Sequence, residues 1–233
     1  MKSHREHNEP ALRSRMRAAW LCKNIGGTLG APHEGHTGFL HLCHYDPVPT
    51  EPAPNDDLDL QLVWMQALRR HGLLLTPAHL AECRERNITC HIFEYHAAQR
   101  NMRRGLLAPV TGSFDNWYIA GMGAAIRTEV WACIAAGDPL MAALYAHLDA
   151  TLDHAGDGVH AEVFFAVLES LAFHGGARHD LLDEALRYIP DDCDMARAIR
   201  MAIDLHARGT SLHAARVWSH PRDVLQAPRG RSL

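Results

Sequence analysis

Hydrophobic residues recur along the chain at the three- and four-residue spacing of helices, and no stretch alternates as a half-buried strand does. The pattern predicts an all-α domain of eight or nine helices. The expected helices cover residues 11–29, 56–71, 76–86, 89–103, 139–152, 159–173, 179–188 and 192–208, and one more follows the glycines at 121 and 123 and runs to about 135. Ser211 is expected to cap a further short helix that runs to Trp218.

The clearest helix start lies at residues 55–57. Asn55 is the predicted N-cap, and Asp56 and Asp57 follow in the first turn, where the helix dipole favours negative charge. An apolar face then recurs at helical spacing, formed by Leu60, Val63, Trp64, Ala67 and Leu68. Two interpretations remain open, because these carboxylates either stabilise the helix start or bind a hard cation such as Mg²⁺.

The first helix ends in a glycine-rich segment. Gly26, Gly27 and Gly30 allow close packing of another helix or bring backbone near a ligand. Gly30 and the following Ala31-Pro32 end the helix and leave Glu34 in a loop. Glu34 is a solvated loop residue unless it faces the carboxylates of residues 56–59.

A second glycine-containing segment comprises Gly121, Met122, Gly123 and Ala124. We expect a helix to follow directly and to reach Ala135. Bare N–H groups at such a helix start bind phosphate and other anions, which is the functional interpretation. Close packing between helices is the structural alternative for these glycines.

The length of 233 residues allows one large domain or two small ones, and we expect a single domain over residues 1–218 with a disordered tail over 219–233. The formal charge of −4 disfavours a dedicated nucleic-acid-binding protein, which usually carries a basic face. We find no signal-peptide pattern and no run of 18 apolar residues, so no membrane segment is expected. The six cysteines are scattered without a CxxC pair, which predicts reduced thiols in a cytoplasmic protein.

Several potential zinc ligands lie between the first two helices. They are His33, His36, His41, Cys43 and His44. Their spacing fits none of the closed zinc patterns, and we therefore do not expect a zinc site in this segment.

Four stretches, in this order, resemble the ADP-ribosylglycohydrolase family, which includes the dinitrogenase reductase-activating glycohydrolases and the ADP-ribosyl-acceptor hydrolases. They are residues 26–35 (GGTLGAPHEG), 55–59 (NDDLD), 121–127 (GMGAAIR), and Asp153-His154 ahead of an apolar helix. The second stretch is similar to the family's Thr-Asp-Asp metal motif, with Asn55 in the first position. The resemblance implies an orthogonal multi-helix bundle.

The resemblance also implies a function. Family members use a binuclear Mg²⁺ or Mn²⁺ site to hydrolyse the N- or O-glycosidic bond between ADP-ribose and a protein side chain, or act on small molecules that contain ADP-ribose. By motif match, the metal ligands are Asn55, Asp56 and Asp57, and the catalytic residues are Glu34 and Asp57. The residues expected along the ADP-ribose are Gly121, Met122, Gly123, Ala124 and His154, with Met122 where many members have asparagine.

The sequence departs from the family late in the chain. Family members carry a second acidic motif, of Asp-x-Asp-Thr type, that completes the metal site, and no such motif precedes Leu233. The segment 191–194 (DDCD) is a superficial candidate, but its position favours an N-cap. We therefore keep three hypotheses: a hydrolase that is incomplete without this motif, an inactive ADP-ribose-binding module, and an α-helical interaction protein.

Overall fold

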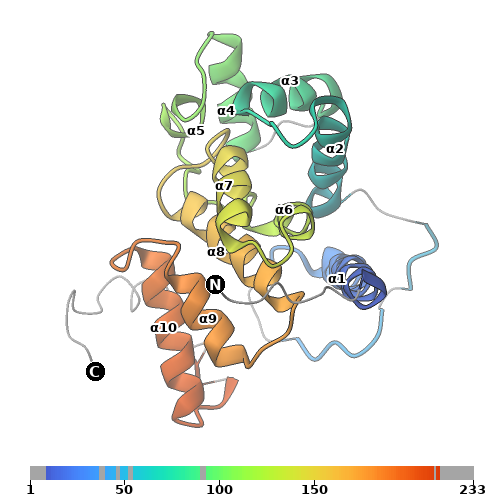
Figure 1. The fold of residues 1–233 in the computed structure, drawn as a ribbon, viewed down its shortest axis with the longest axis vertical. Helices are drawn as coiled ribbons and strands as arrows, with labels where there is room; N and C mark the ends of the chain where they lie inside the picture. The colour runs from blue at the N-terminus through green and yellow to red at the C-terminus, as the bar shows by residue number, and fades with distance from the viewer. Residues whose placement is uncertain are drawn as a thin grey trace.

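The computed structural model describes residues 9–36, 40–45, 48–51, 55–89, 93–212 and 214–215. These residues form ten α-helices and two 3₁₀-helices without a strand, which confirms the all-α fold class (Figure 1). The elements are α1 (Glu9–Gly30), η1 (Ala31–His33), α2 (Asp56–His71), α3 (Pro77–Asn87), α4 (Phe93–Arg103), α5 (Val110–Ser113), η2 (Ala125–Arg127), α6 (Glu129–Ile134), α7 (Pro139–Ala150), α8 (Asp157–Ala172), α9 (Arg178–Leu186) and α10 (Asp194–Ala207). No helix in these ranges has the length and apolar content needed to cross a membrane.

Helices α7 and α8 pack against each other at the centre of the fold, with α3–α5 towards one end and α9 and α10 towards the other (Figure 1). Small residues allow this close packing, because Ala142, Ala146 and Ala150 recur every four residues on α7 and are fully buried. Phe164 and Val167 of α8 are also fully buried. These two helices therefore form the scaffold on which the other elements are placed.

An aromatic stack joins α2, α6 and α7. The ring centroid of Trp131 lies 6.3 Å from that of Trp64 and 5.7 Å from that of Tyr145. The Trp131 indole N–H donates a hydrogen bond of 2.8 Å to the carboxylate of Asp149. Buried aromatic rings contribute both apolar area and specific geometry, so this stack fixes α2 relative to the central helices.

Helix α1 lies at the side of the fold and has no fully buried residue. One face of the helix is nevertheless half-buried and mostly apolar. It consists of Leu12, Met16, Ala19, Trp20 and Lys23. Arg15 also attaches α1 to the core by donating a 2.7 Å hydrogen bond to the carbonyl of Phe173.

The prediction of one continuous helix from the glycines to Ala135 is wrong. After the turn at residues 121–124 the chain forms η2, and Thr128 separates η2 from α6. The physical reason is tertiary, because the Arg127 side chain is fully buried and hydrogen-bonded to carboxylates of the core. The structure also has the short helix α5 between α4 and η2, where none of the expected helices lies.

The helix start at residues 191–194 agrees with the N-cap interpretation, but the capping group differs. The sulfur of Cys193 accepts the hydrogen bond from the Ala196 N–H, and α10 begins at Asp194. Ser211 caps the next turn as expected, since its hydroxyl accepts from the Ala214 N–H at 3.3 Å. The continuation towards Trp218 and the tail over 219–233 lie outside the described residues.

Candidate active site

The four residues predicted near a metal line one cavity of about 750 Å³ between the end of α1 and the start of α2. Asn55, Asp56 and Asp57 approach it from α2, and Glu34 approaches it from the turn after η1. We call this space the acidic cavity. Carboxylate and amide oxygens are the ligands that Mg²⁺ and Mn²⁺ prefer, so these residues fit the metal that the resemblance implies.

Asn55 is the N-cap of α2, as predicted. Its side-chain oxygen accepts a 3.0 Å hydrogen bond from the Asp57 N–H. Its amide nitrogen lies against Gly27 of α1, so closely that a Cβ atom on Gly27 would overlap it. Gly27 thus allows α1 and the start of α2 to approach each other, and the Asn55 oxygen proposed as a metal ligand already accepts one hydrogen bond.

Asp57 lies in a network of polar side chains behind the cavity. The ammonium of Lys23 is 3.8 Å from the Asp57 carboxylate and 3.2 Å from that of Glu129, and it donates a 2.5 Å hydrogen bond to the Ile126 carbonyl. Gln61 donates to the Asp57 carbonyl and to the Glu129 carboxylate, at 2.8 and 2.7 Å. The network therefore links α1, α2 and α6.

Electrostatics at Asp57 favour a cation. Burial raises the pKa of the Asp57 carboxyl, the neighbouring carboxylates of Asp56, Glu129 and Glu34 raise it further, and Lys23 opposes them. Like charges that crowd one site disfavour ionisation, and a divalent cation offsets this repulsion. The cavity thus concentrates more negative charge than Lys23 alone neutralises.

The glycines of residues 121–124 pack against α4. A Cβ atom on Gly123 would overlap the Glu94 carboxylate and lie 2.8 Å from the Tyr95 hydroxyl, and one on Gly121 would lie 3.1 Å from the Tyr118 carbonyl. Ala124 is fully buried and Met122 is 73% exposed. Close packing therefore explains Gly123, and contact of this segment with ADP-ribose remains a prediction.

His154 lies fully buried behind that segment. Its Nδ1 atom is 2.6 Å from the Asp153 carboxylate, and its Nε2 atom is 3.7 Å from the Glu94 carboxylate. Glu94 in turn contacts the position where Gly123 lacks a side chain. His154 is thus connected to the glycine segment through Glu94, and its predicted contact with ADP-ribose remains untested.

A buried charge cluster supports this part of the fold. We define it as Arg84, Arg127, Asp149, Asp153 and Glu162, all 1% exposed or less. Arg127 donates 2.8 Å hydrogen bonds to Asp149 and to Asp153, and Arg84 donates one of 2.7 Å to Asp153. Buried charges persist only when they are paired in this way. Because Arg127 closely follows the glycine segment, the cluster anchors that segment to the central helices.

The pKa values of two carboxyl groups in the cluster, Asp153 and Glu162, shift in opposite directions. Burial alone would raise the pKa of Asp153, but the adjacent Arg127 and Arg84 guanidiniums hold it well below its usual range. Burial raises the pKa of Glu162 well above its usual range, and the Asp149 carboxylate raises it further while Arg127 opposes. The two guanidiniums therefore favour the anionic form of Asp153, whereas burial beside Asp149 disfavours a charge on Glu162.

Sequence reasoning missed five polar residues that support the site, namely Lys23, Gln61, Glu94, Arg127 and Glu129. Only Lys23 is recognisable from the sequence. It lies on the apolar face of the first helix, where a charged residue needs a buried partner. The other contacts connect residues that are distant in sequence.

Comparison with known proteins assigns the chain to a protein family. The model of the family described as ADP-ribosylglycohydrolase matches residues 8–228. A search among curated proteins and a search among solved structures each returned no match. The matched range includes the acidic cavity, the glycine segment and the buried charge cluster. With nearly the whole chain matched and an all-α fold, this protein belongs to the ADP-ribosylglycohydrolase family.

Proposed function

We propose that the chain is a hydrolase that removes ADP-ribose from modified protein side chains, or from small molecules that contain ADP-ribose, with Mg²⁺ or Mn²⁺ in the acidic cavity. One observation carries the proposal. Glu34, Asn55, Asp56 and Asp57 come from two separate segments and line the same cavity. The five cysteines among the described residues are free thiols, which fits action in the cytoplasm.

The proposed roles follow from the positions of the side chains. Asp56, Asp57 and Asn55 would hold the metal, which supplies activation of water and stabilises negative charge when bound. Glu34 and Asp57 are the carboxylates that would accept the proton of the attacking water. In the reaction, water adds to the anomeric carbon of the ribose, the glycosidic bond breaks, and a proton passes to the departing nitrogen or oxygen.

Residues behind the cavity have a positioning role in this proposal. Lys23 and Gln61 hold Asp57 and Glu129 at fixed separation and so orient the carboxylate that faces the cavity. Gly121–Ala124 would lie along the ADP-ribose, and His154 would keep that segment in place through Glu94. The expected partner is thus an ADP-ribosylated protein or an ADP-ribose derivative.

A second candidate function is binding of ADP-ribose without catalysis. It is favoured by Lys23, whose ammonium already supplies one positive charge 3.8 Å from Asp57, and by the Asn55 oxygen, which is already engaged in the cap. Both features reduce the charge and the ligand atoms available to a metal ion.

Calorimetry with ADP-ribose, in the presence and absence of Mg²⁺, tests both candidates. The variant is Asp57→Ala, and the matched control is Asp59→Ala, in the same helical turn but outside the cavity lining. Metal-dependent binding that only Asp57→Ala loses, together with release of ADP-ribose from a modified protein, supports the hydrolase. Binding without release supports the second candidate, and a folded protein that binds neither ligand rejects both.

A further inference from the structure

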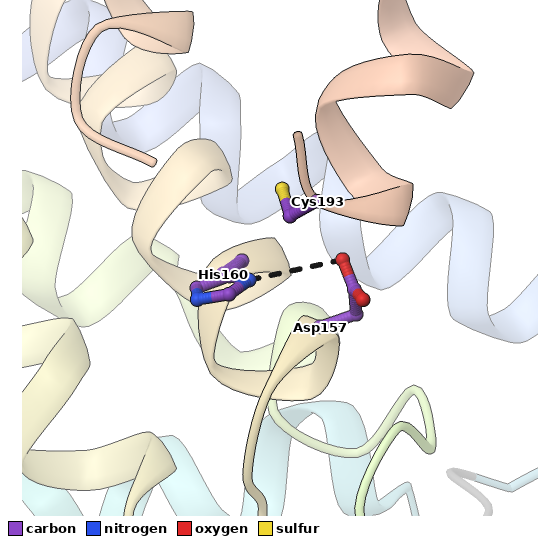
Figure 2. Close-up of side chains that lie close together, drawn as sticks. All are labelled: Asp157, His160 and Cys193. Atoms are coloured by element: carbon purple, nitrogen blue, oxygen red, sulfur yellow. Dashed lines mark ion pairs between the residues drawn. The ribbon is translucent and has the colours of Figure 1, made fainter. Parts of the chain in front are cut away.

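Three potential metal ligands of different chemistry meet at the starts of α8 and α10, away from the residues that line the acidic cavity. Asp157 and His160 belong to the first turn of α8, and Cys193 is the N-cap of α10 (Figure 2). A carboxylate oxygen, an imidazole nitrogen and the Cys193 sulfur all lie within 4.8 Å of one another. Within the described parts of the chain, no other group of three or more His, Cys, Asp or Glu residues comes this close.

Local helix geometry creates the cluster. Residues three apart on a helix lie on one face, so Asp157 and His160 point the same way, with the Asp157 oxygen 3.7 Å from His160 Nδ1. The α10 start is fixed against them, because the Met195 N–H donates a 2.8 Å hydrogen bond to Asp157. Cys193 is thereby held over the first turn of α8.

One potential ligand atom in the cluster, His160 Nδ1, makes no hydrogen bond to a residue that the structure describes. This nitrogen is buried. A buried ring nitrogen left without a hydrogen bond is unfavourable, and a metal ion would satisfy it. Both side chains are also partly accessible to solvent, since Asp157 is 33% and His160 27% exposed at the side chain.

The donor set identifies the class of ion. Imidazole nitrogen and thiolate sulfur are preferred by Zn²⁺, which also accepts a carboxylate oxygen, in a tetrahedral arrangement. In a tetrahedral Zn²⁺ site with one sulfur, the ligand atoms lie about 3.3–3.5 Å apart, given Zn–N of about 2.0 Å and Zn–S of about 2.3 Å. Since the three atoms lie within 4.8 Å of one another, they need to approach by no more than about 1.5 Å, and three protein ligands leave one position for water.

We propose that Asp157, His160 and Cys193 bind one Zn²⁺ or a similar thiol-preferring divalent cation that joins the start of α8 to the start of α10. Binding replaces the thiol proton of Cys193, which is released to solvent, by a sulfur–metal bond. The ion would stabilise the α8 start, three residues after His154. The site is separate from the proposed Mg²⁺ site, whose oxygen ligands select a harder cation.

Titration of the full chain with Co²⁺ tests the proposal, because a cysteine thiolate bound to tetrahedral Co²⁺ gives a charge-transfer band in the near ultraviolet. We expect this band in the wild type, with displacement by Zn²⁺. Cys193→Ser is the decisive variant, because serine is a good N-cap and preserves the start of α10. It should lose the band and weaken Zn²⁺ binding by at least about tenfold.

Two controls make the outcome specific. Cys22→Ser removes an exposed thiol outside the cluster and should retain the band. Asp57→Ala should also retain the Co²⁺ band, because Asp57 lines the acidic cavity and not this cluster. The test of this site is therefore independent of the test of the proposed Mg²⁺ site. A folded wild type without the band, or a band that persists in Cys193→Ser, would overturn the proposal.

Discussion

Gly27 of α1 lies directly against the side-chain amide of Asn55, the residue that caps α2. The contact joins two segments that the sequence separates by a proline-rich stretch. It sets how closely the end of α1 approaches the start of α2, and therefore how Glu34 and Asp57 come to line the same cavity. The geometry of the acidic cavity thus depends on the absence of one methyl group.

Replacement of Gly27 by alanine should displace Asn55 and disrupt the cap of α2. Loss of an N-cap costs about 1 kcal/mol, partly offset by the better helix propensity of alanine. We expect Gly27→Ala to weaken Mg²⁺ binding in calorimetry far more than it lowers the free energy of unfolding.

Gly26→Ala is the matched control for Gly27→Ala. A Cβ atom at Gly26 would meet nothing within 4 Å, and the residue is also inside α1. It should stabilise the protein by roughly 0.5–1 kcal/mol through helix propensity and leave Mg²⁺ binding unchanged. Equal behaviour of the two variants would show that the contact between Gly27 and Asn55 does not shape the cavity.

Asp153→Asn should destabilise the protein by about 3–5 kcal/mol, because the buried Arg84 and Arg127 guanidiniums lose their shared carboxylate. Urea unfolding measures the loss. Asp115→Asn is the control, since it removes an ion pair to Arg100 in which the two side chains are 51% and 32% exposed. That change should cost less than about 1 kcal/mol, and similar losses in both variants would argue against a special role for the buried cluster.

The buried carboxyl group of Glu169 should make the stability of the protein depend on pH. Burial raises the pKa of its carboxyl from 4.5 to about 8, with Glu129 adding to the increase while the hydrogen bond from Thr128 and the charge of Lys23 oppose it. Between these values the unfolded chain has lost the proton that the folded chain keeps, so the free energy of unfolding falls as pH rises from 4.5 to 8.

Glu169→Gln removes this titration while keeping an oxygen that accepts from Thr128. The free energy of unfolding, measured with urea, should fall less from pH 5 to pH 8 in the variant than in the wild type. The difference should be at least about 1 kcal/mol. Glu184→Gln, which changes a 40% exposed side chain on α9, should follow the wild type. A parallel pH profile for wild type and Glu169→Gln would contradict the assignment.

Gly123→Ala tests the link from the glycine segment to Glu94. The added methyl group would overlap the Glu94 carboxylate, whereas at Gly121 the nearest atoms would be 3.1–3.4 Å away and tolerate a small shift. We expect ADP-ribose affinity, measured by calorimetry, to fall by about tenfold or more in Gly123→Ala and to change less in Gly121→Ala. The reverse order would disprove this packing argument.

Local signals in the sequence predicted much of the fold and only part of the site. Helix α2 was predicted to the residue, because Asn55 caps it and a glycine follows His71. The helix expected between the glycines and Ala135 is divided, because Arg127 turns towards carboxylates of α7 and its C-terminal loop, a contact that no local pattern encodes. Motifs in the sequence point to Glu34 and Asp57, whereas the contact between Lys23 and Glu129 depends on the packing of α1 against α6.

Because α1 has no fully buried residue, it should unfold before the central helices. A helix held by half-buried contacts opens locally at a lower free energy than the core. Opening of α1 would remove Gly27 and Lys23 from α2 and abolish the acidic cavity while α7 and α8 stay intact. Amide hydrogen exchange should therefore be fastest in α1 among the long helices, and a ligand that bridges the cavity should slow exchange there first.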